Sequence, residues 1–522
     1  MKRLVSWLLW LLMFGAAYAQ SGGDVTRYVW DLSSLYPNDA AWEAERAIIR
    51  QKLTTIERRK GTLGRHARSL ADGLDEIADL RRRAHKLSVY GTLTSAVDSK
   101  SEKAARAQSV SNAFETQVEA AVSFAADEVR AIGAPRLRQW LRAEPRLAAH
   151  QRYLNQALRE APHTLPAQAQ TILRNLSGRW AQLTADAYQA LLEADLNWLV
   201  IRGSDGKEVT VDAGSYATLL RAPEQSVRLA AATAYLGRLR ALEQPLGLLL
   251  TRRIEADLTV AQQRHFSSGL EALFFLRDGM PRGSQRVMTE VARANLATFQ
   301  RYLALRRRVL GLERLTYADL RVPPPAGTRR FTVPESMEIA IAASAPLGTE
   351  YQARLRERLA KPWMHLPPAP EKRAIYAIFP PVGGAAPYTI MNFRGSYTNA
   401  RAFTGAATLM MSYADTPANR MPDTRYDPGI YSNAVLNAGY ILHDDYLREH
   451  AANRDERITS LLHALDRIQS QYFDWTLAAE FETQVEQAVR DGQPPTGAEL
   501  SRRYLALLRD YFGHARGVTV VD

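Results

Sequence analysis

No charged residue occurs between Ala402 and Ala414, a stretch built mostly from Ala, Gly, Thr, Leu, Met and Phe. The stretch is too short to span a bilayer, which needs roughly 20 consecutive apolar residues. An uncharged segment of this length, set in a long chain of mixed polarity, is typical of a helix buried inside a large soluble protein. We therefore predict a buried central helix within 392–415, around which the rest of the chain is arranged.

The first residues have the pattern of an export signal. Lys2 and Arg3 precede an apolar run that ends in the small-residue site Ala17-Tyr18-Ala19. This pattern predicts a signal peptide at 1–19, cleaved after Ala19, and a mature protein that is periplasmic or secreted. The alternative is an uncleaved membrane anchor, but the apolar run is shorter than a spanning helix requires. We therefore expect no stable membrane insertion after cleavage.

The composition limits the partners of the mature chain. The sequence contains no Cys, which excludes disulfides, thiolate metal ligands and lipid attachment at a cysteine. The formal charge of +12 becomes +12 − 2 = +10 once Lys2 and Arg3 are removed. A basic surface attracts anionic partners, but export argues against nucleic acid. Runs such as 81–83 and 306–308 are more typical of solvated helix faces than of a binding patch.

Periodic patterns predict a mainly helical protein. Apolar residues recur at three- and four-residue steps over 71–98 and 101–132. An Asp-Gly turn between two alternating runs predicts a β-hairpin over 198–212. The β-like run 387–392 follows a Pro-rich stretch and predicts a small sheet with an exposed edge strand. The predicted fold class is all-α with this hairpin and a short edge-strand sheet, divided into an N-terminal helical lobe at 20–196 and a second domain at 197–522.

The order of these features resembles the oligoendopeptidase F family, zinc metallopeptidases of the thimet-oligopeptidase type. The resemblance covers nearly the whole mature chain, and it implies two helical lobes around a deep cleft. The matching pieces are Trp30–Tyr36, the hairpin at 198–212, Arg264–Ser268, Tyr317–Leu320, Pro346–Tyr351, Pro387–Asn392, Ala478–Glu482 and Tyr504–Gly513.

The chemistry that the resemblance implies depends on a His-Glu-x-x-His motif, whose two His bind zinc while the Glu serves as general base. Counted from Asn392 without a gap, the first His falls on Gly405, the Glu on Ala406 and the second His on Leu409. The third ligand, a Glu of the next helix, falls on Asn433. Aliphatic side chains donate no lone pair and an amide is a poor zinc ligand, so we expect no catalytic residues and no bound metal here.

The histidines offer no replacement motif. The chain has ten His, and no two of them are four residues apart. His443 and His450 lie seven apart on one predicted helix and could in principle hold a metal. The simpler interpretation is two solvated helix residues.

The resemblance also implies a further segment beyond Asp522, with residues that contact substrate, so the chain is expected to be C-terminally truncated relative to the family. These departures predict a non-catalytic, peptide-binding or scaffolding pseudopeptidase. In the family an edge strand pairs with an extended peptide. The corresponding groove residues here would be Gly383, Gly384, Tyr388, Asn392 and Arg394. The alternatives are an inactive subunit that partners an active peptidase homologue and a zinc endopeptidase that cleaves oligopeptides.

Overall fold

The computed structural model describes residues 25–193, 197–323, 329–369, 371–372, 376–382, 385–415 and 429–522. The predicted signal peptide at 1–19 lies outside these residues. No helix in the described ranges is both long enough and apolar enough to cross a membrane.

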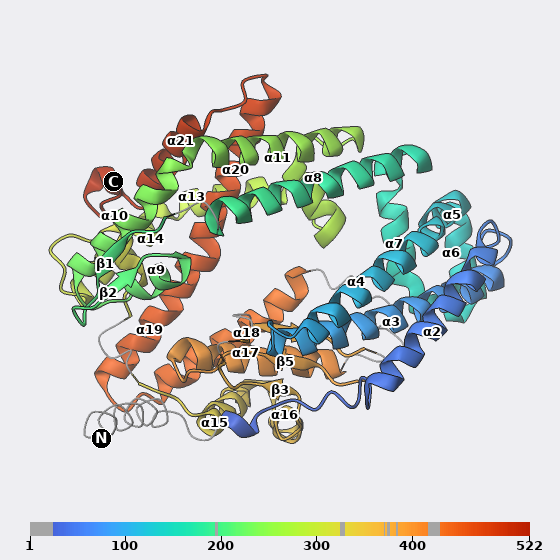
Figure 1. The fold of residues 1–522 in the computed structure, drawn as a ribbon, viewed down its shortest axis with the longest axis horizontal. Coiled ribbons are helices and arrows are strands. Elements are labelled where there is room, and N and C mark those ends of the chain that lie inside the picture. Colours follow the sequence, from blue (N-terminus) through green and yellow to red (C-terminus); the bar gives the residue numbers. More distant parts are fainter. Residues whose placement is uncertain are drawn as a thin grey trace, which may run out of the picture. The chain divides into compact units, whose positions relative to one another are not determined.

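The chain folds into two compact units, each built from two separate stretches of sequence. Unit 1 comprises Met1–Ala161 and Arg329–His450, and unit 2 comprises Pro162–Thr328 and Ala451–Asp522. The predicted boundary between residues 196 and 197 does not coincide with this division, because it falls inside unit 2. Both units are mainly helical, as the periodic patterns predict (Figure 1).

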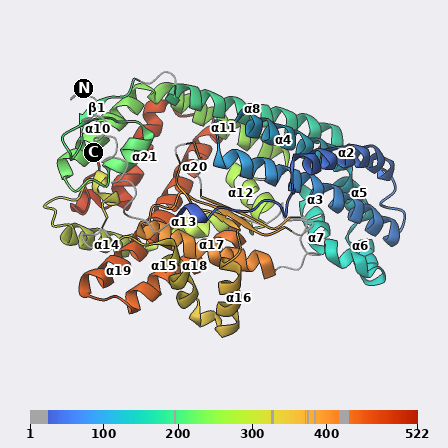
Figure 2. The ribbon, with the colours of Figure 1, turned by 60° about the horizontal axis from the view of Figure 1, so that its bottom comes forward.

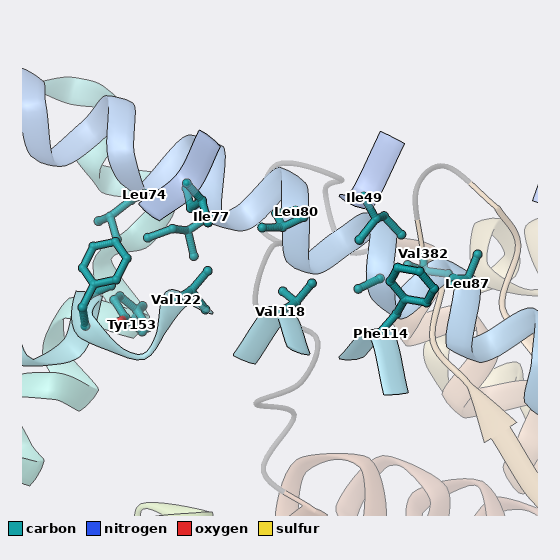
Figure 3. Packing of buried hydrophobic residues seen from close by; sticks show 14 of the residues in the cluster. Ile49, Leu74, Ile77, Leu80, Leu87, Phe114, Val118, Val122, Tyr153 and Val382 are labelled. Atoms are coloured by element: carbon teal, nitrogen blue, oxygen red, sulfur yellow. The ribbon is translucent and has the colours of Figure 1, made fainter. Parts of the chain in front are cut away.

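The first stretch of unit 1 is a set of helices around one apolar core. Its elements are η1 (Val25–Arg27), α2 (Asp39–Ile56), η2 (Glu57–Arg59), α3 (Ala67–Val97), α4 (Glu102–Val122), α5 (Phe124–Ile132), α6 (Ala134–Ala143), η3 (Pro145–His150) and α7 (Gln151–Glu160). Asn38 and Ser101 cap α2 and α4 by accepting a backbone N–H with their side chains. Figure 3 shows how the apolar face of α3, with Ile77 and Leu80, meets Val118 and Val122 of α4. The single helix predicted over 101–132 is two helices, because the chain leaves the α-helical ladder at Ser123.

The second stretch of unit 1 contains the central helix and a small sheet. Its elements are α15 (Val333–Ala343), η7 (Ala345–Leu347), α16 (Thr349–Leu359), β3 (Met364–His365), β4 (Ala377–Phe379), β5 (Tyr388–Ile390), α17 (Tyr397–Asp415) and α18 (Gly429–Glu449). The predicted central helix is confirmed as α17. Its apolar side chains, including Phe403 and Met410, are buried in a cluster with residues of α15, α16 and β3.

Unit 2 is a second helical body with its own core. Its elements are η4 (Ala161–His163), which begins in unit 1, then α8 (Ala167–Glu193), β1 (Val200–Arg202), β2 (Glu208–Thr210), α9 (Ala213–Leu219), α10 (Gln225–Ala241), α11 (Glu243–Gln263), α12 (Gly269–Leu273), η5 (Phe274–Asp278), α13 (Ser284–Ala294), α14 (Leu296–Val309), η6 (Tyr317–Arg321), α19 (Arg454–Ile468), η10 (Gln469–Phe473), α20 (Asp474–Arg490), α21 (Gly497–Tyr511) and η11 (His514–Arg516). The long helices α8 and α11 lie side by side in both views (Figures 1 and 2).

The predicted β-hairpin is confirmed in unit 2. Strands β1 and β2 pair antiparallel, with Ile201 opposite Val209. Gly206 in the connecting turn has φ +76°, a left-handed conformation that glycine adopts without steric cost. The Asp-Gly signal in the sequence therefore identifies the turn correctly.

Candidate functional site

The two helices that carry the predicted degenerate positions, α17 and α18, pack against each other in unit 1. Helix α17 supplies Gly405, Ala406 and Leu409, and α18 supplies Asn433. Because α17 carries no charge from Ala402 to Ala414, it can be covered by neighbouring elements without burying an unpaired ion.

Gly405 lies at a close approach of α17 and α18. A Cβ atom at Gly405 would lie 2.4 Å from Cε1 of Tyr440 and 3.0 Å from the carbonyl oxygen of Leu436. From the other side, a Cβ at Gly439 would lie 2.8 Å from the Cα of Gly405. These distances are shorter than van der Waals contact, so the two backbones meet with no side chain between them. A histidine at position 405 would require Tyr440 to move and the helices to separate.

The next two positions are filled by apolar packing. Ala406 is completely buried and belongs to the same cluster as Phe403 and Met410. Leu409 is also buried. Asn433 is exposed on α18, and its backbone carbonyl accepts a hydrogen bond from the side-chain amide of Asn437 at 2.9 Å. Only the fourth position therefore presents a polar side chain.

A buried polar network lies beside these positions on the same helix pair. A hydrogen bond of 2.9 Å joins Thr404 Oγ1 to Nδ1 of His443, and both side chains are buried. The hydroxyl of Tyr397 donates to Asp444 at 3.0 Å, and Arg401 forms an ion pair with the same carboxylate at 3.7 Å. The network thus links polar groups of α17 to polar groups of α18 through direct bonds.

The interpretation of His443 as a solvated residue is wrong. Its side chain is completely buried, because α18 turns this face toward Thr404 and the ring of Tyr397, whose centroid lies 5.5 Å from that of His443. His450 is exposed as expected, and its Nδ1 donates to the carbonyl of Tyr446 at 2.9 Å.

The residues at the four predicted positions do not fit a zinc ion. Zinc sites in proteins need three or four converging nitrogen, sulfur or carboxylate donors. Gly405, Ala406 and Leu409 contribute none, and the ring of Tyr440 and the carbonyl of Leu436 occupy the space that a side chain at position 405 would need. Among the described residues, no group of three His, Asp or Glu side chains is placed to hold a metal.

The predicted peptide-pairing strand is not an edge strand. In the three-stranded sheet β5 is central, parallel to β3 and antiparallel to β4. Both edges of β5 are therefore occupied. The prediction was wrong because both partners of β5 are too short, at two and three residues, to give a periodic signal of their own.

Tyr388 does not line a groove. It is 1% exposed, and its hydroxyl donates to the carbonyl of Asp31 at 2.9 Å and contacts the hydroxyl of Ser34 at 2.6 Å. These bonds fasten the N-terminal segment of unit 1 to the sheet. Tyr388 is therefore a structural residue.

The other predicted groove residues have different surroundings. Gly383 and Gly384 lie outside the described residues. Asn392 is partly buried, whereas Arg394 is exposed. The backbone of Arg394 is held on both sides, since its N–H donates to Asn399 at 2.8 Å and its carbonyl accepts from Arg330 at 3.2 Å.

Within the part of the chain that the structure describes, strand β4 is an edge of this sheet with no second strand beside it. The outer side of β3 is covered, because the N–H of Leu366 donates to the carbonyl of Tyr28 and the N–H of Asp31 donates to that of Pro362. Within the described residues, β4 pairs with β5 alone. Tyr376, just before β4, donates its hydroxyl to the carbonyl of Ala402 at 2.8 Å and so ties this edge to α17.

A buried lysine forms hydrogen bonds to backbone carbonyls in and next to the strands of this sheet. No pattern in the sequence predicts this feature. The ammonium group of Lys372 donates to the carbonyls of His365, Pro367 and Met391 at 3.0, 2.9 and 2.7 Å. Burial lowers the pKa of Lys372 to about 8. Burial and the nearby charge of Lys372 lower the pKa of His365 to about 4, so this imidazole is neutral. Because these bonds use all three N–H donors of the ammonium group, we interpret Lys372 as a structural residue.

Comparison with characterised proteins gives a consistent result. A family model described as Oligopeptidase F matches residues 128–197. Oligopeptidase PepF of Bacillus subtilis is 23% identical, with the similarity covering 93% of this chain and 72% of that protein. Group B oligopeptidase PepB of Streptococcus agalactiae is 22% identical, over 93% of this chain and 80% of its own.

Two solved structures have the same fold. A putative peptidase from Chlamydophila abortus superposes with a TM-score of 0.77 at 21% identity, covering 93% of this chain and 82% of that one. Oligoendopeptidase-F from Enterococcus faecium gives a TM-score of 0.67 at 21% identity, with the same coverage.

Proposed function

Because the chain belongs to the oligoendopeptidase F family, we propose that it is a non-catalytic member that binds extended peptides without hydrolysing them through zinc. The observation that carries the first half of this proposal is the close packing at Gly405, where an added Cβ would lie 2.4 Å from the ring of Tyr440. Zinc-dependent hydrolysis needs a metal to activate water and a nearby base. The positions that would supply these groups hold Gly, Ala and Leu.

The packing around these positions supports a protein that folds stably without a bound metal. A buried donor with no metal and no partner costs about 1–3 kcal/mol. Apolar residues at positions 406 and 409 avoid that cost, and the polar groups near them are joined in the network of Thr404, His443, Tyr397 and Asp444.

Strand β4 is the element to which we assign peptide binding. The N–H groups of Thr389 and Met391 donate toward β3, so those of Tyr388 and Ile390 point toward β4. In the antiparallel register Ile378 lies opposite Thr389. The backbone N–H and C=O of Ile378 therefore point away from β5, toward the side of β4 on which the described residues place no strand. An extended peptide could pair there as an additional strand.

The experiment that tests this proposal measures binding and cleavage on the same peptides. A mixture of unstructured peptides is incubated with the protein, and mass spectrometry then follows the intact peptides in the bound and free fractions. PepF of Bacillus subtilis serves as the cleaving control. The proposal expects enrichment of intact peptides on the protein and no new fragments. Chelator-sensitive fragments, or the absence of any enrichment, would contradict it.

A further inference from the structure

A cavity in unit 2 uses none of the residues of the helix pair or the sheet described above. It has a volume of about 300 Å³ and is lined by residues of α11, α12, η5 and α20. This volume is at the lower end of the range for small-molecule sites. Its lining residues are Arg253, Ile254, Asp257, Val260, Ala261, Arg264, Gly269, Leu270, Ala272, Leu273, Leu276, Arg277, Glu482 and Glu486.

The apolar part of the wall comes from α11, α12 and η5. Ile254, Val260, Leu270 and Leu276 are each partly exposed, so their side chains present apolar surface to the cavity. The segment that carries Leu276, η5, is a π-helix. Single π-helical turns within α-helices occur often at functional sites, because they redirect side chains.

Most charged groups of the wall already have partners. Arg253 donates to Asp257 at 2.6 Å, and Arg277 donates to Asp278 at 2.7 Å. Arg264 also has an interaction of its own. The arginines therefore do not form a free anion site.

Glu486 is fixed as part of the wall. It is 4% exposed, accepts the N–H of Gly269 at 2.9 Å, and is paired with Arg490 at 3.0 Å. This carboxylate serves the start of α12, where negative charge is favourable, and it is saturated by these donors.

Glu482, unlike the other charged residues of the wall, has no such partner among the described residues. Among the described residues, no cation or hydrogen-bond donor is paired with its carboxylate, and its charged neighbours are the carboxylates of Asp257 and Glu486. Burial and these two like charges raise the pKa of Glu482. The cavity therefore combines an apolar wall with one uncompensated carboxylate, an arrangement that a cation with an apolar body complements.

We propose that this cavity is a binding site for a small organic cation, an alkylammonium or alkylguanidinium, whose charged head pairs with Glu482 and whose body packs on Leu270 and Leu276. This inference does not depend on the proposed function, because the cavity lies within unit 2 and uses none of the residues of α17, α18 or the sheet.

The experiment compares three ligands of the same length by isothermal titration calorimetry on the full chain at pH 7.5: hexylammonium, hexanol and hexanoate. The proposal expects saturable 1:1 binding of hexylammonium, at least tenfold weaker binding of hexanol and weaker binding still of hexanoate. Equal binding of all three would mean that Glu482 has no role, and no binding of hexylammonium would overturn the proposal.

Two variants then locate the site. Glu482→Gln should weaken hexylammonium binding at least tenfold and leave hexanol binding unchanged. Glu290→Gln is the matched control, because Glu290 is an exposed carboxylate of α13, paired with Arg286 and outside this cavity, and it should bind as the wild type does. An unchanged affinity in a folded Glu482→Gln variant would contradict the assignment.

The pH dependence gives a readout that needs no variant. Because the pKa of Glu482 is raised, hexylammonium binding should weaken on acidification at a higher pH than an ordinary glutamate would give. The other charged groups facing the cavity keep the partners described above: Arg253 with Asp257, Arg277 with Asp278, Glu486 with Arg490, and Arg264 with its own interaction. Affinity that stays constant down to pH 4 would contradict the role of this carboxylate.

Discussion

The Cα of Gly405 on α17 lies so close to Gly439 on α18 that a single added Cβ on Gly439 would come within 2.8 Å of it. The resemblance to the oligoendopeptidase F family predicts that position 405 corresponds to the first histidine of the zinc motif. On that correspondence, a contact between two helix backbones occupies the position expected for a metal ligand.

The contact predicts that Gly439→Ala destabilises the protein. Alanine is favoured over glycine in a helix by about 1 kcal/mol, but its Cβ would also lie 2.6 Å from Oγ1 of Thr408. Such overpacking costs about 1–3 kcal/mol, so we expect a net loss in the free energy of unfolding measured by urea denaturation.

The control for this prediction is Gly237→Ala on α10, where no atom lies within 4 Å of the added Cβ. That variant should gain stability, because only the helix preference acts. Gain of stability in both variants would mean that α17 and α18 are not in close contact.

Tyr388→Phe tests the reassignment of this residue from groove to structure. The substitution leaves the carbonyl of Asp31 and the hydroxyl of Ser34 without their partner. We expect a loss of about 1–3 kcal/mol in the free energy of unfolding and unchanged peptide affinity. A loss of peptide affinity with unchanged stability would restore Tyr388 to a binding role.

Ile378→Pro tests β4 as the peptide-pairing edge. Proline removes the N–H that points away from β5 and leaves the ladder bonds at Ala377 and Phe379 in place. Peptide affinity, measured by fluorescence anisotropy, should fall at least tenfold. Ile378→Val keeps the N–H and should bind as the wild type does. Equal peptide affinity of the proline and valine variants would contradict the assignment of peptide binding to β4.

The lowered pKa of His365 predicts that the protein loses stability as the solution becomes acidic. Its pKa is about 4 in the folded protein against 6.5 in the unfolded chain, so the unfolded state binds more protons between these values. The free energy of unfolding should therefore fall as the pH drops from 6.5 to 4, by up to about 3 kcal/mol for this group.

His365→Phe keeps an aromatic ring opposite Trp30, whose centroid lies 5.3 Å away, and removes the titration. The unfolding free energy of the wild type, relative to that of the variant, should therefore decrease as the pH falls from 6.5 to 4. A constant difference would show that His365 does not titrate with a lowered pKa.

The sequence was sufficient to predict the elements that have a strong local signal. The uncharged run identified α17, and the Asp-Gly turn identified the hairpin of β1 and β2. The sheet was placed correctly, but its strand order was not, because β3 and β4 are too short to be recognised and only pairing reveals that β5 is central.

Prediction of the candidate site from the sequence was limited in the same way. Residue types at positions 405, 406 and 409 could be read directly, yet the closeness of Gly439 depends on the way in which α18 packs on α17. The burial of His443 and of Lys372 was equally hidden, since both residues lie in polar local sequence and are covered by segments distant along the chain.

The most direct test of the central claim is the zinc content of the purified protein after incubation with zinc and dialysis, measured by mass spectrometry of the metal, with cleavage of quenched peptides followed in parallel. The account predicts far less than one zinc per chain and no cleavage that a chelator abolishes. One zinc per chain, together with chelator-sensitive cleavage, would contradict it.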